Sequence, residues 1–239
     1  MSFVVNRDLN ILKMHHKYTA RIAGLLYFLF IATFILSAVI RNPFIVPGDA
    51  GSTLANIGGS SWSFRFVIIS ELVSLLFFLL AAWKLHILLK ETGKHLALLF
   101  LLLNVAGVAV ESINTINLFA VLQLAEGNYS KVFSQEQMQA SVSFFLGLYK
   151  NGFMVAQLFF SVWLLPLGYL VFRSGFLPKT LGILVMLDFL FWLLYFFQYY
   201  LFPGFKEMMY ISFPVAFVAE VSLTFWLLVK GVKENVVVS

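Results

Sequence analysis

The sequence contains no cysteine and only four histidines. Without cysteine there can be no disulfide bond, no thiolate ligand for a metal and no palmitoylated thiol. The histidines lie in or beside polar segments, at His15, His16, His86 and His95. These shortages argue against zinc, iron–sulfur and bis-histidine haem sites, so we expect neither a metal site nor a cofactor.

Charged residues are also scarce, at 11% of the 239 residues, whereas hydrophobic residues make up 61% and include 28 phenylalanines. A soluble domain has an apolar fraction of about 45 to 50%. The apolar residues fall in runs of about 20 or more, which is long enough for a helix to cross a hydrocarbon core of about 30 Å. The fold class predicted is an all-α, polytopic integral membrane protein.

Six apolar runs are expected to span the membrane, at about residues 18–40, 64–89, 96–124, 138–172, 180–201 and 211–230. We treat residues 18–230 as a single transmembrane domain, preceded by an N-terminal segment, 1–17, and followed by a tail, 231–239. The first run is too long for the core of a signal peptide and is kept as helix one. Loop 41–63 is expected to carry a short surface helix, which Asp49 would cap and Gly58 and Gly59 would end.

Six spans put both termini on the same side, and the basic residues gather in the segments on that side. By the positive-inside rule, both termini are therefore predicted to be cytoplasmic. This pattern also explains the net charge of +5 without a nucleic-acid partner. The basic residues on the cytoplasmic side are Arg7, Lys13, Lys17, Arg21, Lys84, Lys90, Lys94, Arg173, Lys179, Lys230 and Lys233, against Arg41, Arg65, Lys131, Lys150 and Lys206 outside.

Three glutamates, Glu71, Glu111 and Glu220, lie inside separate predicted spans. A charged side chain at the centre of a membrane helix costs on the order of 2.5 to 3.5 kcal/mol, so such residues face the protein interior and often mark a site. Counting 1.5 Å per residue from the span ends puts Glu71, Glu220 and Glu111 about 10, 13 and 8 Å below the outer surface. The shared depth predicts a polar site in the outer half of the bilayer.

Helical periodicity places most other polar residues of the spans on the same faces as these carboxylates or on one face of the fourth helix. The ligand-binding or ion-binding candidates are Glu71, Asn104, Glu111, Asn114, Lys150, Gln157 and Glu220. Asp188, in the fifth span, lies apart from them by depth and is a secondary candidate. Taken singly, polar residues of this kind often serve only as hydrogen-bond links between helices.

The constellation predicts an acidic cavity that binds or transports a small molecule, a lipid or an ion, the proton included. Membrane lipids are the expected partners, and the sequence does not set the oligomeric state. Two other functions stay open. One is a membrane enzyme that modifies lipids with a glutamate as general acid or base, although no catalytic motif or residue can be assigned. The other is a structural or regulatory subunit of a membrane complex.

Several short stretches, in this order, resemble a bacterial family of six-helix membrane proteins, the domain of unknown function 4386 family. They are residues 23–27, 46–50, 55–57, Tyr169 with 173–178 and 181–182, and Glu220 with 226–232. The resemblance implies a protein of the bacterial cytoplasmic membrane and supplies no substrate. It also implies that family members often carry a histidine where this chain has Tyr149 and Lys150, and an acidic residue later in helix five than Asp188.

Overall fold

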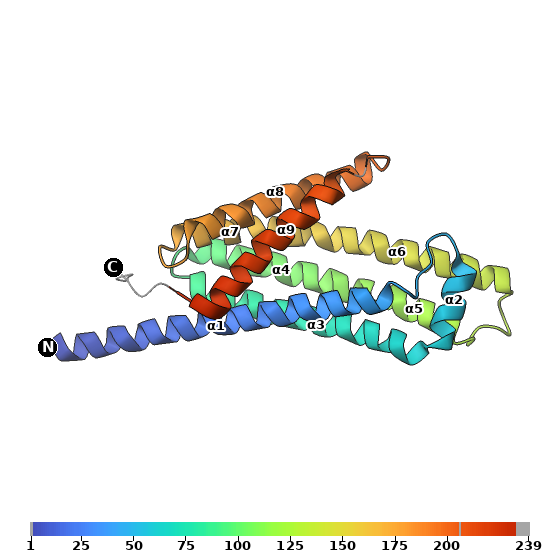
Figure 1. The fold of residues 1–239 in the computed structure, drawn as a ribbon, viewed down its shortest axis with the longest axis horizontal. Coiled ribbons are helices and arrows are strands. Elements are labelled where there is room, and N and C mark those ends of the chain that lie inside the picture. The colour runs from blue at the N-terminus through green and yellow to red at the C-terminus, as the bar shows by residue number, and fades with distance from the viewer. Residues whose placement is uncertain (1, 206, 233–239) are drawn as a thin grey trace. The chain divides into compact units, whose positions relative to one another are not determined.

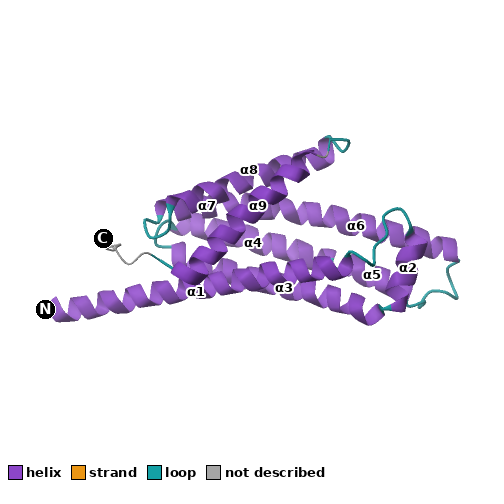
Figure 2. Ribbon diagram, in the orientation of Figure 1, coloured by secondary structure: helices purple, strands orange, loops and turns teal. Residues whose placement is uncertain are grey.

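The computed structural model describes residues 2–205 and 207–232 of the chain. Within them the structure has nine α-helices, one π-helical turn and no strand (Figures 1 and 2). In chain order these elements are α1 (Ser2–Arg41), α2 (Ala50–Gly59), α3 (Ser61–Leu89), α4 (Lys94–Asn114), α5 (Ile116–Ala125), α6 (Gln135–Val162), α7 (Leu164–Arg173), α8 (Lys179–Leu201), α9 (Glu207–Phe225) and η1 (Trp226–Lys230).

Among the described residues, six helical segments are long and apolar enough to cross a membrane, which confirms the predicted fold class. They are His16–Arg41, Ser61–Leu89, Lys94–Ala125, Gln135–Arg173, Lys179–Leu201 and Tyr210–Lys230. Large apolar side chains such as Val39, Leu76 and Leu102 are exposed along them, as lipid-facing positions are. The chain is a multi-pass membrane protein, and the side on which its termini lie stays a prediction.

Helix α1 begins at Ser2, so the polar residues of the predicted segment 1–17 continue the first membrane helix. Residue 1 and most of the predicted tail, residues 233–239, lie outside the described residues. Helix α9 begins at Glu207, four residues before the predicted start of the sixth span. The chain divides into two compact units: unit 1 contains residues 1–28, 78–107 and 157–239, and unit 2 contains residues 29–77 and 108–156.

Unit 2 contains α2, which lies in the loop where a short helix was predicted. Asp49 caps its N-terminus, because its side chain accepts hydrogen bonds from the backbone N–H and hydroxyl of Ser52, at 2.8 and 2.6 Å. These bonds hold the pKa of the Asp49 carboxyl below its ordinary value. Helix α2 packs against α5 around the buried side chains of Ile57, Phe64 and Leu122.

Unit 1 contains the α7–α8 hairpin and a cluster of buried aromatic rings. The rings of Tyr27 and Phe78 stack at 5.7 Å between centroids, and Trp163 meets Phe78 edge-on at 5.1 Å. In the hairpin, a Cβ on Gly182 would lie 2.6 Å from the carbonyl oxygen of Gly168. The lack of a side chain there lets the two helices approach closely and fixes α8 against α7.

Two of the membrane segments are interrupted. Helix α6 ends at Val162, because Pro166 has no N–H to donate to the Val162 carbonyl. The other interruption, at Thr115 between α4 and α5, was not predicted. There the Thr115 hydroxyl donates to the Glu111 carbonyl at 3.0 Å, a bond from side chain to backbone that bends helices.

Candidate functional site

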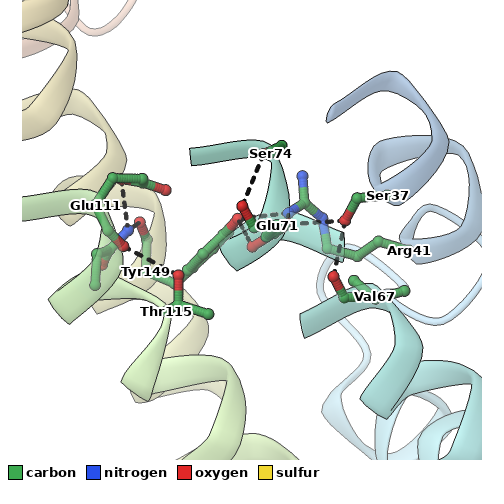
Figure 3. A network of polar contacts seen from close by, with 9 residues as sticks. Ser37, Arg41, Val67, Glu71, Ser74, Glu111, Thr115 and Tyr149 are labelled. Atoms are coloured by element: carbon green, nitrogen blue, oxygen red, sulfur yellow. Dashed lines mark hydrogen bonds and ion pairs between the residues drawn. The ribbon is translucent and has the colours of Figure 1, made fainter. Parts of the chain in front are cut away.

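The polar centre of unit 2 is an ion pair between Arg41, the last residue of α1, and Glu71 of α3 (Figure 3). The side chain of Glu71 is 7% exposed and that of Arg41 is 21% exposed. Ser37, one helical turn before Arg41, donates its hydroxyl to the Val67 carbonyl at 3.1 Å and to Glu71 Oε1 at 3.3 Å. The charge of Glu71 is therefore balanced within the network.

Tyr149 of α6 holds this ion pair from a second side. Its hydroxyl lies 3.0 and 2.9 Å from the two carboxylate oxygens of Glu71 and accepts a hydrogen bond from Arg41 Nη1. The Arg41 guanidinium also lies 5.2 Å from the centre of the tyrosine ring, which is within cation–π range. Three helices thus meet at the hydroxyl of one tyrosine.

Glu111 of α4 lies at the other end of the same network. Asn114 Nδ2 donates to Glu111 Oε2 at 3.3 Å and to the backbone carbonyl of Tyr149 at 2.9 Å. Asn117 Nδ2 in turn donates to Asn114 Oδ1 at 3.1 Å. We call Ser37, Arg41, Glu71, Glu111, Asn114 and Tyr149 the unit 2 network.

A small residue on α6 makes room for Asn114. A Cβ added to Gly152 would overlap the Asn114 amide, whereas a Cβ on Gly147, on the same helix, would meet no atom within 4 Å. Gly152 is therefore needed for the close approach of Asn114 to α6, and Gly147 is not.

The unit 2 network has two carboxylates and one guanidinium. Glu71 takes the ion pair with Arg41, and Glu111 forms no ion pair with any described residue. Glu111 is nevertheless 7% exposed and lies inside a membrane segment. If all three groups are charged, the network carries one negative charge in excess, and a buried charge of this kind requires a partner.

The predicted candidates lie in both units. Glu71, Glu111 and Asn114 come together in unit 2. Lys150 is also in unit 2, but its side chain is exposed and the adjacent Tyr149 takes part in the network. Asn104, Gln157, Asp188 and Glu220 belong to unit 1.

In unit 1, Glu220 of α9 interacts electrostatically with Asp188 of α8 and with Tyr27 of α1. The sequence had grouped Glu220 with Glu71 and Glu111 by depth. Asn104 and Gln157 are buried as well, and neither amide atom of Asn104 has a hydrogen-bond partner in the described chain. Buried polar groups therefore occur in both units.

Three residues of the unit 2 network, Ser37, Arg41 and Tyr149, were not among the predicted site residues. Arg41 had been assigned to the outer loop because the apolar run ends at residue 40. The sequence nevertheless contains a sign that Arg41 continues the helix. Arg41 follows Ser37 by four residues, which puts both side chains on the same face of one helix. Tyr149 carries no charge, and the charged residue beside it, Lys150, was predicted as a site residue instead.

Glu71 and Glu111 line neither of two surface pockets that the described part of the chain contains. One, of about 460 Å³, is lined in unit 2 by residues that include Arg65 and Glu126, which pair at 2.6 Å. The other, of about 490 Å³, is lined in unit 1 by His86, Lys90, Glu91, Lys94 and Leu98. Among the residues with described side chains, no group of three or more histidine, aspartate or glutamate side chains could hold a metal ion.

Comparison with known families gives a match to the sequence model described as "Domain of unknown function (DUF4386)", over residues 22–231. The match covers most of the chain and includes every residue of the unit 2 network, together with Tyr27, Asp188 and Glu220. It confirms the resemblance seen in the sequence. Neither the curated proteins nor the solved structures give a match.

Proposed function

The chain belongs to the DUF4386 family, and we propose that it binds a primary ammonium group, of a small molecule or of a lipid headgroup, at the unit 2 network. The observation that carries this proposal is the imbalance of two carboxylates against one guanidinium. Arg41 and Tyr149 satisfy Glu71, so Glu111 is the carboxylate left to receive a positive charge.

The hydrogen bonds around Glu111 support an ammonium ligand. Only Oε2 accepts a bond from a described side chain, at a long 3.3 Å, and Oε1 accepts none from the described residues. A primary ammonium offers three N–H donors and one positive charge, which together match the unfilled acceptor positions of a carboxylate. Transition metals are a poorer fit, because histidine and thiolate ligands are not present in the network.

The depth of Glu111 supports a ligand with an apolar part. By the count from the span end, Glu111 lies about 8 Å below the outer surface, within reach of a lipid headgroup or an amphiphile that enters from the outer leaflet. This placement assumes that the protein lies in the bacterial cytoplasmic membrane with both termini inside, as its basic residues and its family favour. Transport would follow if the bound molecule also reached the opposite side.

The proposal can be tested by the thermal stability of the purified protein in nanodiscs of phosphatidylethanolamine or phosphatidylglycerol, with ethanolamine added to the latter as the free amine. We expect wild-type protein to melt several degrees higher when the primary ammonium is present. Glu111→Gln should lose this gain. Glu136→Gln, which removes an exposed acid at the start of α6 in the same unit, should keep it.

The phosphatidylethanolamine nanodiscs and the free ethanolamine distinguish the two sources of the ammonium group. A gain only in phosphatidylethanolamine indicates a lipid headgroup, and a gain with free ethanolamine indicates a small soluble amine. Equal melting in all conditions, or equal gains in wild type and Glu111→Gln, would overturn the proposal and leave a structural role for the network. A changed lipid mass after incubation would instead support the lipid-modifying alternative.

A further inference from the structure

Asp188 occupies an unusual position in unit 1. It lies in α8 with no exposed surface, and both of its carboxylate oxygens are buried without a hydrogen-bond donor among the residues that the structure describes. Leaving a carboxylate in this state is costly, because neither water nor protein compensates its charge. Some group that is not part of the described chain is needed to satisfy it.

A second carboxylate is close by. Glu220 interacts electrostatically with Asp188, and the helices that carry the two acids pack against each other. The packing is fixed by the hydroxyl of Ser212 on α9, which donates to the Phe191 carbonyl on α8 at 2.9 Å, and by Trp192 and Phe213, whose ring centres are 5.1 Å apart. The two acids are therefore held near each other by rigid neighbouring helices.

Further oxygen atoms surround this pair. Tyr27, which is 1% exposed on α1, interacts electrostatically with both acids. Thr224 follows Glu220 by one helical turn, so it shares the face of α9 that carries the acid. Its hydroxyl is buried and has no partner within the described residues. A buried hydroxyl without a partner among the described residues, one helical turn from Glu220, is an independent sign that something is bound there.

No side chain that the structure describes supplies the positive charge that such a pair requires. No lysine, arginine or histidine of the described chain forms an ion pair with Asp188 or Glu220. From α1, α8 and α9, the ionisable groups that interact with this pair are Tyr27 and the two acids themselves. Two carboxylates that interact in a low-dielectric medium do not both stay charged without a compensating cation.

We propose that Asp188 and Glu220 together hold one positive charge, either a proton on one of the two carboxyls or an alkali cation, with the hydroxyls of Tyr27 and Thr224 as neighbouring oxygen groups. An alkali cation is a hard ion that prefers carboxylate and hydroxyl oxygens, and a proton needs only the two carboxylates. This site belongs to unit 1 and does not depend on the ammonium site proposed for unit 2.

The proton form is tested by infrared difference spectra of purified protein between acidic and alkaline buffer, with ¹³C-labelled aspartate and glutamate. We expect a protonated-carboxyl band in wild type that disappears in both Asp188→Asn and Glu220→Gln. The band should persist in Glu111→Gln, which separates this site from the unit 2 network. It should also persist in Glu91→Gln, a control at an exposed acid of unit 1.

The cation form is tested by melting the same proteins in sodium, potassium and choline chloride at equal ionic strength. We expect an alkali salt to raise the melting temperature of wild type by several degrees, and not that of Asp188→Asn or Glu220→Gln. A wild-type protein with neither the infrared band nor the salt effect would overturn the proposal, whether or not the variants fold. Signals that survive in both variants would overturn it as well.

Discussion

Arg41 and Glu71 form an ion pair inside a membrane protein, and the hydroxyl of Tyr149 contacts both partners. The pair joins the end of α1 to α3, and the tyrosine adds α6. With the neighbouring Glu111, this arrangement combines a balanced carboxylate with an unbalanced one. Structural and ligand-binding roles of the network can therefore be separated by changing one carboxylate at a time.

Removing the charge of Glu71 should destabilise the protein through Arg41. In Glu71→Gln the guanidinium keeps its charge without a counter-ion, which we expect to cost about 1 to 3 kcal/mol. Breaking fully buried pairs costs about 3 to 5 kcal/mol, and the cost is smaller here because Arg41 is 21% exposed. Reversible unfolding in detergent measures this loss of unfolding free energy. The double variant Arg41→Gln with Glu71→Gln should be less destabilised than Glu71→Gln, and a strictly additive loss would contradict the account.

Removing the hydroxyl of Tyr149 should have a smaller effect. Tyr149→Phe keeps the ring beside Arg41 and loses the hydrogen bonds to Glu71, so we expect a loss of about 1 kcal/mol in unfolding free energy. Tyr129→Phe is the matched control, because Tyr129 lies outside the spans and is exposed. Equal unfolding free energies for Tyr149→Phe and wild type would show that the hydroxyl contributes no stability.

Gly152 and Gly147 give a matched pair of substitutions on α6. Gly152→Ala should displace the Asn114 amide and cost about 1 to 3 kcal/mol, as overpacking does. Gly147→Ala meets no atom and should be neutral or stabilising by up to about 1 kcal/mol, because alanine favours helix. Unfolding midpoints in detergent compare the stabilities of the two variants. A tolerated Gly152→Ala would show that α6 and Asn114 are not closely packed.

The cap of α2 should depend on pH in the acidic range. Because the folded-state pKa of Asp49 lies below its ordinary value, its contribution to stability is present above that ordinary value and is lost as the pH falls through the folded-state pKa. Asp49→Ala should therefore speed hydrogen exchange of the first-turn amides of α2 at neutral pH. Asp49→Asn should keep them protected, since asparagine also caps helices. Protection that is equal in Asp49→Ala and wild type would contradict this role.

The sequence predicted the membrane class and the six spans because long apolar runs leave few alternatives. The interruption before Pro166 can also be read from the sequence, since a proline removes one specific backbone donor. The bend at Thr115 escaped prediction because a threonine in a helix bends it only when its hydroxyl bonds to the preceding turn. Whether the Thr115 hydroxyl makes this bond depends on packing around Asn114 and Glu111.

The candidate site was predicted in part for a similar reason. Depth along the membrane follows from counting residues, and it grouped Glu71 with Glu111, which the structure places in one network. Depth does not give the direction in which a residue faces around the helix, and it separated Asp188 from Glu220, with which Asp188 interacts electrostatically. Tyr149 and Lys150 differ by one residue, or about 100° around the helix, and this rotation decides which of them joins the network.

The most direct test of the central claim is native mass spectrometry of the protein purified from its own membranes, as wild type, Glu111→Gln and Glu136→Gln. The account predicts that a discrete amine-bearing molecule remains bound to wild type and to Glu136→Gln, and is absent from Glu111→Gln. The same bound species on all three proteins, or none on a wild type that is otherwise stable, would contradict a ligand site at Glu111.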